Sequence, residues 1–298
     1  MYKLIALDMD GTLLNSDKQI SEPNKEAIRQ ARAAGVTVVL ASGRPLEGMQ
    51  SKLEELQIDS DKDFVLFYNG SMVKNVATGE IIHEQIIDGK AAKKIARLAD
   101  KLGVFVHAFS KEFGLITPQN NPYTDIEANI NGLNITEMNF DALEDDHPII
   151  KTMIVAEPSE LTKAIAALPA TLHDEFTIVQ SAPFFLEFLN PASNKGIGVA
   201  AIAEYLGIRA EEVICMGDAE NDHHMLKYAG LGIAMANAME ETKQTWEAAE
   251  QDEQSFAEII VKTGDSPTWC QADVADYITN SNNDHGVATA IEKFVLQA

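Results

Sequence analysis

Four short polar stretches of this sequence each follow a run of apolar residues. They are residues 8–12, 42–44, 69–70 and 217–222. The first and last of them carry the carboxylates of Asp8, Asp10, Asp218 and Asp222. Four carboxylates brought close together repel one another strongly unless a cation neutralises them, and a set of oxygen ligands favours Mg²⁺. The pattern therefore predicts a magnesium site, and chemistry on a phosphoryl group is its natural use.

A parallel sheet would bring these four stretches to one place. In open α/β sheets, ligands bind beyond the carboxyl ends of the strands. Apolar runs and helical patterns alternate here, an order typical of strand-helix-strand units. We predict a doubly wound, Rossmann-like parallel sheet. Its strands are expected at residues 4–7, 36–41, 64–68, 213–216 and 232–235, and its helices between Ser21 and Gly35 and at residues 45–56, 195–205 and 221–228.

The pattern changes in the middle of the chain. A helix expected at residues 89–102 is followed by two strands, and the same order returns between residues 149 and 189. A chain of 298 residues is also long for one domain. We therefore predict a catalytic core formed by residues 1–83 and 190–298, with an α/β cap domain of residues 84–189 inserted into it.

Lys195 stands at the start of a predicted helix. The positive end of the helix dipole disfavours a cation there by about 0.3–1 kcal/mol, so another group must favour the charge. A phosphate held between Lys195, the metal and the hydroxyl of Ser42 would do so. The alternative is a solvated surface lysine.

Composition narrows the classes of partner. The net charge of -23 opposes binding to nucleic acid or to anionic membrane surfaces, because both depend on clustered Lys and Arg. The two cysteines provide no disulfide framework, and we find neither a signal-peptide pattern nor an apolar run of membrane-spanning length. We expect a cytoplasmic protein whose partner is a small phosphorylated metabolite.

The polar stretches also match a known family. Residues 8–12, 42–44, 194–196 and 217–222 occur in the order and with the residue types of its four motifs. Over nearly its whole length the chain resembles the haloacid dehalogenase-like hydrolases, in particular the Cof-type, sugar-phosphatase-like members with a large inserted (type IIB) cap. The resemblance implies a Mg²⁺-dependent phosphatase acting on small phosphomonoesters through an aspartyl-phosphate. Sugar phosphates are the first expectation, and pyridoxal phosphate or flavin mononucleotide are alternatives that the family allows.

The resemblance also implies roles for individual residues. Asp8 would be the nucleophile, and Asp10 would protonate the leaving group and then activate water. The expected phosphate-binding residues are Ser42, Gly43, Lys195 and Asn221. The expected metal site consists of Asp8, the backbone carbonyl of Asp10, Asp218 and the supporting Asp222. Thr12, Arg44 and Asn69 are expected to support these groups, and the cap would exclude water and set the choice of substrate.

Two other functions remain open at this stage. A phosphomutase would use the same residues with an alcohol in place of water. A non-catalytic phospho-accepting regulatory module would need only Asp8, and the presence of Asp10 and of a cap argues against it. The chain also departs from the family pattern by an acidic insertion at about residues 242–273, for which we expect a surface position.

Overall fold

We analysed a computed structural model of the chain, which describes residues 1–243 and 274–297. The chain divides into two compact units, residues 1–40 with 202–298 and residues 41–201. The sequence placed its domain boundaries near residues 83 and 190, and those limits stay a prediction. Apart from Thr242 and Lys243, the predicted insertion lies outside the described residues.

An eight-stranded sheet has the strand order β15-β14-β13-β1-β2-β3-β4-β5. Its first five strands in this order are joined by parallel pairs, whereas β3, β4 and β5 are joined by antiparallel pairs. The predicted parallel α/β core is confirmed, and the β4 and β5 strands extend it. The strands are β1 (Leu4–Leu7), β2 (Thr37–Ala41), β3 (Phe64–Phe67), β4 (Met72–Asn75), β5 (Ile81–Glu84), β13 (Val213–Gly217), β14 (Leu231–Ala234) and β15 (Tyr277–Ile278).

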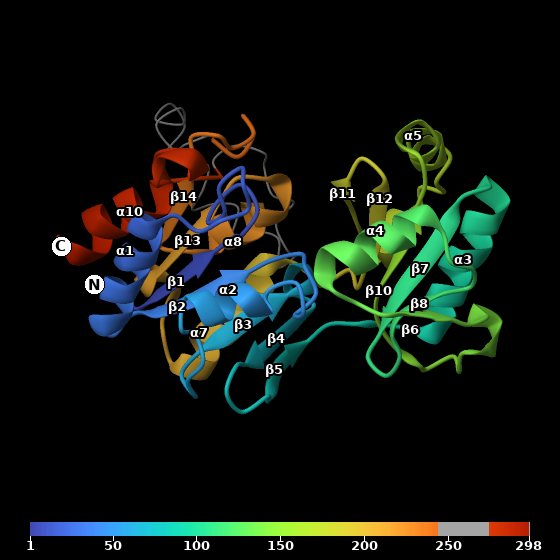
Figure 1. The fold of residues 1–298 in the computed structure, drawn as a ribbon, viewed down its shortest axis with the longest axis horizontal. Coiled ribbons are helices and arrows are strands. Elements are labelled where there is room, and N and C mark those ends of the chain that lie inside the picture. Colours follow the sequence, from blue (N-terminus) through green and yellow to red (C-terminus); the bar gives the residue numbers. More distant parts are fainter. Residues whose placement is uncertain (244–273, 298) are drawn as a thin grey trace, which may run out of the picture. The chain divides into compact units, whose positions relative to one another are not determined.

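The central strand β1 shows why this sheet forms. All of its side chains are fully buried, as expected for an apolar strand inside a parallel sheet. Leu4 is in register with Thr37 on one side and with Val213 on the other. In the first unit α1 packs against α10, and α8 packs against β13 and β14 (Figure 1). The described α-helices outside residues 84–189 are α1 (Glu22–Ala33), α2 (Gln50–Glu55), α7 (Lys195–Leu206), α8 (His223–Tyr228) and α10 (Gly286–Ile291). A π-helical turn, Glu292–Leu296, follows α10.

The start of α1 agrees with the prediction, and the start of α2 differs from it. Ser21 occupies the N-cap position of α1, but its hydroxyl contacts Nδ1 of His285 at 2.9 Å and makes no capping bond. The helix predicted at residues 45–56 begins only at Gln50. Tight turns precede it, and a Cβ on Gly48 would lie 2.3 Å from Oδ1 of Asn131, so glycine permits this close approach.

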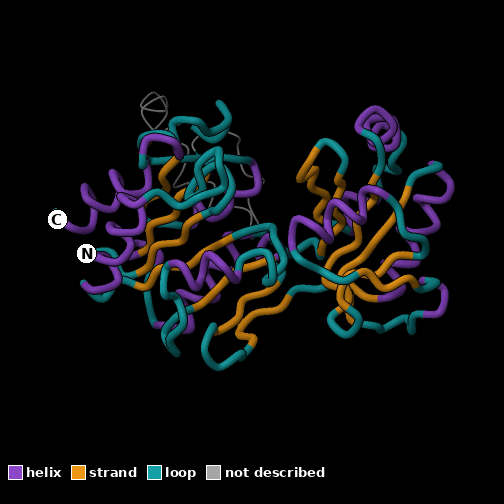
Figure 2. Tube along the Cα trace, in the orientation of Figure 1, coloured by secondary structure: helices purple, strands orange, loops and turns teal. Residues whose placement is uncertain are grey.

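A second, seven-stranded sheet lies wholly within the second unit. Five of its strands follow the order β11-β12-β10-β7-β8, with β9 beside β8 and β6 beside β10. Figure 2 shows its strands in orange and its helices in purple. Its strands are β6 (Ile87–Asp88), β7 (Phe105–Ser110), β8 (Gly114–Thr117), β9 (Ile135–Glu137), β10 (Pro148–Val155), β11 (Thr177–Ala182) and β12 (Phe185–Leu189), and its helices are α3 (Gly89–Leu102), α4 (Pro122–Asn131), α5 (Pro158–Ala166) and α6 (Leu172–Glu175).

One face of this second sheet carries an apolar core. Ile95 of α3 and Leu161 of α5 are fully buried against sheet residues that include Val106, Ile154 and Phe188. Local signals fix α3, because the Asp88 side chain accepts a hydrogen bond from the N–H of Ala91 and the helix stops at Gly103 with a φ of 71°.

Among the described residues, no helix is both long enough and apolar enough to cross a membrane.

Candidate active site

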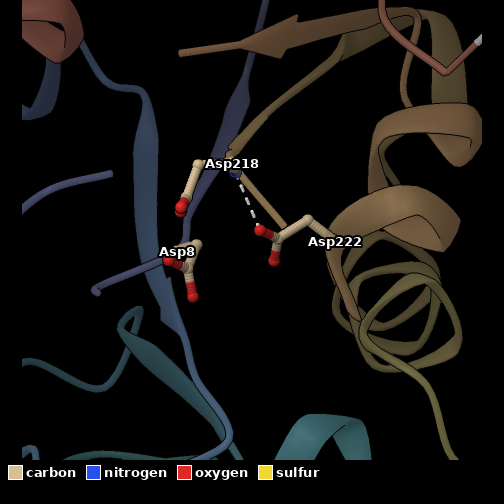
Figure 3. Close-up of side chains that lie close together, drawn as sticks. All are labelled: Asp8, Asp218 and Asp222. Atoms are coloured by element: carbon tan, nitrogen blue, oxygen red, sulfur yellow. Dashed lines mark hydrogen bonds between the residues drawn. The ribbon is translucent and has the colours of Figure 1, made fainter. Parts of the chain in front are cut away.

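Three carboxylates gather beyond the ends of β1 and β13 (Figure 3). Asp8 follows β1, Asp218 follows β13, and Asp222 closes the one-turn helix Glu220–Asp222. Each offers an oxygen, and these oxygens all lie within 4.8 Å of one another. Asp8 is 6% exposed and Asp222 is fully buried. The three carboxylates repel one another, and water screens the repulsion poorly because two of them are buried. The group therefore favours a divalent cation.

Hydrogen bonds hold two of these carboxylates in place. Oδ2 of Asp222 accepts from the backbone N–H groups of Asp218 at 2.9 Å and of Ala219 at 3.1 Å. The hydroxyl of Thr12 donates to Oδ1 of Asp218 at 2.9 Å, and the supporting role of Thr12 stays a prediction. The loop after β13 is thus tied both to itself and to the loop after β1.

Gly11 makes the close approach of these two loops possible. Its φ is 87°, in the left-handed region that side chains other than glycine seldom adopt. A Cβ at this position would lie 2.3 Å from Oδ2 of Asp218. The carbonyl of Gly11 also accepts a hydrogen bond from Nδ2 of Asn237 at 2.8 Å. Any larger residue would therefore displace the Asp218 carboxylate.

Asp10 lies close in sequence to this group, but its carboxylate is directed elsewhere. Its Oδ1 accepts a 2.8 Å hydrogen bond from Nζ of Lys18, and its side chain is 38% exposed. The metal role expected for the backbone carbonyl of Asp10 stays a prediction. The exposed carboxylate suits proton transfer.

The thiol and the imidazole next to these carboxylates are softer ligands, and carboxylate oxygens suit a hard cation better. Burial, reinforced by the Asp222 carboxylate, raises the pKa of the Cys215 thiol, so the thiol stays protonated. Burial lowers the pKa of His223, and Nε2 of that ring contacts the hydroxyl of Thr242 at 2.8 Å. The site therefore presents oxygen ligands, and the three carboxylates fit Mg²⁺.

A second group of predicted residues comes together within residues 41–201. The hydroxyl of Ser42 accepts from the backbone N–H of Arg44 at 3.2 Å, and the carbonyl of Ser42 accepts from the N–H of Asn69 at 3.0 Å. A Cβ on Gly43 would lie 2.9 Å from Nδ2 of Asn69. The guanidinium of Arg44 donates to the carbonyl of Gly48 at 3.3 Å.

Lys195 belongs to this second group. A Cβ on Gly70 would lie 2.1 Å from the carbonyl oxygen of Asn194, so the two predicted motifs touch through their backbones. Lys195 is fully buried at the start of α7, so the alternative of a solvated surface lysine is wrong. Asn221 lies in the first unit, half-buried in the same turn as Asp222.

Sequence reasoning missed a buried charged group in the second unit. Lys151 of β10 and Glu187 of β12 form a 3.0 Å ion pair with side chains almost inaccessible to solvent, and Glu127 of α4 is 6% exposed. A signal was present in the sequence. Lys151 and Glu187 are single charged residues inside otherwise apolar strands, a combination that a buried strand tolerates only when the charges are paired.

Comparison with known proteins identifies the family. Residues 5–260 match the family model described as haloacid dehalogenase-like hydrolase. The chain belongs to the haloacid dehalogenase-like hydrolases. The protein named "Putative phosphatase YxeH" from Bacillus subtilis is 35% identical, with 99% of each chain covered. The "5-amino-6-(5-phospho-D-ribitylamino)uracil phosphatase YcsE" of the same organism is 31% identical over 99% of this chain and 96% of its own length.

A solved structure extends this likeness to the fold. The crystal structure of a haloacid dehalogenase-like hydrolase from Bacteroides thetaiotaomicron has a TM-score of 0.78 and 31% identity, and the match covers 98% of this chain and 99% of that one. The family resemblance, the α/β fold and the enzyme class predicted from the sequence, a phosphatase, are confirmed.

Proposed function

We propose that the chain is a Mg²⁺-dependent phosphatase that hydrolyses small phosphomonoesters, sugar phosphates foremost, through an aspartyl-phosphate on Asp8. The observation that carries this proposal is the gathering of Asp8, Asp218 and Asp222 within 4.8 Å. The phosphatase names of full-length relatives support the reaction class. We place the enzyme in the cytoplasm, with a small phosphorylated metabolite as its partner.

In the proposed reaction Asp8 is the nucleophile and Asp10 is the general acid and base. A carboxylate oxygen of Asp8 attacks phosphorus, and the bond from phosphorus to the leaving alkoxide breaks as Asp10 gives that alkoxide a proton. Asp10 then takes a proton from water as the water oxygen attacks the phosphorus of the aspartyl-phosphate, which releases phosphate and restores Asp8. The exposed position of the Asp10 carboxylate supports this exchange of protons.

The remaining residues position the phosphoryl group. We assign its oxygens to the hydroxyl of Ser42, the backbone of Gly43, the ammonium of Lys195 and the amide of Asn221, which offset the charge that builds up during transfer. Mg²⁺, held by Asp8, Asp218 and the carbonyl of Asp10 and supported by Asp222, would supply charge neutralisation. Arg44 and Asn69 brace the Ser42 loop through the contacts described above.

Phosphate release from a panel of phosphorylated compounds tests the proposal. The panel contains hexose phosphates, pyridoxal phosphate, flavin mononucleotide and p-nitrophenyl phosphate, each assayed with Mg²⁺ and with a chelator. We expect release that requires the metal, that is lost in Asp8→Asn and that persists in the matched surface variant Asp17→Asn. Full activity of Asp8→Asn would remove Asp8 from the reaction.

The same assay separates the two other functions. A phosphomutase would convert one phosphate ester into an isomer with little free phosphate, and a chromatographic analysis of the products detects that outcome. A regulatory module would retain a phosphoryl group on Asp8 without turnover, which intact-protein mass spectrometry detects as added mass absent from Asp8→Asn. Either result would replace the hydrolase proposal.

A further inference from the structure

Ser71 and Ser193 lie 122 residues apart in the chain and meet through their hydroxyl groups. The hydroxyl of Ser71 donates to Oγ of Ser193 at 3.1 Å, and the Ser193 hydroxyl donates to the carbonyl of Gln85 at 2.9 Å. The backbone N–H of Gln85 donates in turn to the carbonyl of Ser71 at 2.7 Å. These three hydrogen bonds close a ring of Ser71, Gln85 and Ser193, which we call the serine clasp.

The serine clasp joins three segments of the chain. Ser71 precedes β4, Gln85 lies between β5 and β6, and Ser193 lies between β12 and α7. A further hydrogen bond strengthens the connection, because Nδ2 of Asn190 donates to the carbonyl of Ile86 at 2.8 Å. The segment that enters the predicted cap is therefore bonded both to the segment that leaves it and to Ser71.

Ser71 directly follows a strained turn. Tyr68, Asn69 and Gly70 have φ values of 51°, 55° and 88°, so three successive residues are left-handed and two of them carry side chains. Such a conformation persists only where the surrounding structure holds it, and it is commonest at functional sites. The N–H of Asn69 donates to the carbonyl of Ser42 at 3.0 Å. The serine clasp therefore holds one end of a strained turn that contacts the predicted phosphate-binding loop.

Ser193 stands two residues before Lys195 in the chain. A Cβ on Gly70 would lie 2.1 Å from the carbonyl oxygen of Asn194 and 3.0 Å from the backbone nitrogen of Lys195. The strained turn and the start of α7 are thus in direct backbone contact. Because the Lys195 side chain is fully buried, the position of its ammonium depends on where this backbone lies. The bond between Ser71 and Ser193 holds the two backbones together at that point.

Packing alone does not require two hydroxyl groups at this position. Ser71 is fully buried and Ser193 is 2% exposed. Two apolar side chains of the same shape can be nearly as stable as a buried hydrogen-bonded pair. A hydrogen bond differs from an apolar contact because it fixes both a distance and a direction. Such precision suits a group that must hold a phosphate-binding ammonium in place, since small displacements of such groups slow a reaction strongly.

We propose that Ser71 and Ser193 are positioning residues, which act through Lys195 and hold its ammonium at the phosphoryl group. The inference rests on the proposed function, in which Lys195 binds the phosphoryl oxygens. Because the two serines act on the phosphoryl group through Lys195, they affect all phosphate esters alike, whatever the leaving group.

Kinetics of Ser193→Ala in two backgrounds test this proposal. In the otherwise wild-type enzyme we expect kcat/KM to fall about 10-fold, the rate equivalent of one hydrogen bond, by the same factor for p-nitrophenyl phosphate and for a hexose phosphate. The inhibition constant of inorganic phosphate should rise as well. In the Lys195→Met background, Ser193→Ala should change kcat/KM by less than about 2-fold, because the group through which it acts is gone.

Further variants separate positioning from folding. Ser71→Ala repeats the same cycle from the other end of the hydrogen bond, and combining it with Ser193→Ala should cost about as much as either change alone. Thr177→Val is the matched control, because the Thr177 hydroxyl donates to the carbonyl of Pro191 at 3.2 Å in the same segment as Ser193. We expect it to leave kcat/KM unchanged. Urea denaturation shows which variants are folded under the assay conditions.

The outcomes distinguish this inference from the proposed function. Equal losses from Ser193→Ala in both backgrounds, or no loss in a folded single variant, would overturn the positioning role while leaving the phosphatase intact. A loss that differs between the two esters would do the same. Absence of turnover by the wild type on every ester would overturn the proposed function and the inference with it.

Discussion

The Asp222 carboxylate accepts a 2.9 Å hydrogen bond from the backbone N–H of Asp218, four residues earlier. It also accepts one from the N–H of Ala219 at 3.1 Å. Asp222 is fully buried, and its carboxylate oxygens lie within reach of those of Asp8 and Asp218. One side chain therefore both shapes the loop after β13 and adds negative charge to the candidate metal site.

Two substitutions at Asp222 separate these contributions. Asp222→Asn keeps an acceptor oxygen for the loop but removes the charge, so we expect the Mg²⁺ concentration for half-maximal activity to rise about 10- to 100-fold. Asp222→Ala also leaves two backbone N–H groups without their acceptor, which should cost about 1–3 kcal/mol each in the free energy of unfolding.

Metal titrations and urea denaturation measure the two effects. Glu220→Gln is the matched control, because it removes an exposed carboxylate from the same turn. The assignment of Asp222 fails if Asp222→Asn and Glu220→Gln require the same Mg²⁺ concentration.

Gly11 and Gly35 form a natural pair for testing the contact between the two site loops. Both have positive φ, 87° and 88°, so an alanine at either position should cost about 1–2 kcal/mol in the free energy of unfolding. Only at Gly11 would the new Cβ meet the Asp218 carboxylate, at 2.3 Å, whereas nothing lies within 4 Å at Gly35. We expect the larger loss of stability in Gly11→Ala, because only that variant adds a steric clash, and a loss of kcat of about 100-fold in Gly11→Ala alone.

Thermal unfolding and steady-state kinetics on both variants provide the measurement. Equal activity in the two alanine variants would mean that Asp218 needs no fixed position. A loss of activity in Gly35→Ala would instead point to backbone strain as the cause.

The sequence predicted the sheet and the motifs because their signals are local. Buried parallel strands such as β1 are continuous apolar runs, and the residues predicted to act in catalysis follow their carboxyl ends. The α3 bounds were also predictable, from the periodic pattern between Asp88 and Gly103.

Other features depend on partners far away in the chain. The turn before α2 packs closely against Asn131, about 80 residues later, which the sequence around Gly48 does not reveal. The pairing of Lys151 with Glu187 depends on the antiparallel register of β10 and β12. Helix α4 was missed although Asn121, Pro122 and Gly132 form a start and stop signal for it.

Lys195 provides a third test, of charge at the start of a helix. In the proposed function its ammonium holds the phosphoryl oxygens, so Lys195→Met should lower kcat/KM about 100- to 1,000-fold. Lys90 lies in the first turn of α3 but is exposed, and Lys90→Met should leave kcat/KM unchanged.

The readout is the rate of phosphate release, together with circular dichroism to show that each variant is folded. A folded Lys195→Met enzyme with nearly normal kcat/KM would exclude a role for this lysine in phosphate binding and leave only a structural one.

Because of His107, the free energy of unfolding of the protein should depend on pH. Burial, reinforced by the Lys151 cation, lowers the pKa of His107 from 6.5 to about 3. Between these two values the unfolded chain takes up a proton that the native chain does not, so the free energy of unfolding falls as the pH drops below 6.5. The contribution is about 1.4 kcal/mol for each pH unit while this difference is complete.

Urea denaturation of the wild type and of His107→Gln at several pH values from 7.5 to 5 measures this contribution. We expect the difference in unfolding free energy between the two proteins to shift in favour of the variant as the pH falls, because groups shared by both proteins cancel. His173→Gln supplies the control, because it makes the same replacement at an exposed position. A difference between wild type and His107→Gln that stays constant across this range would mean that the His107 ring takes up a proton in the folded protein as readily as in the unfolded chain.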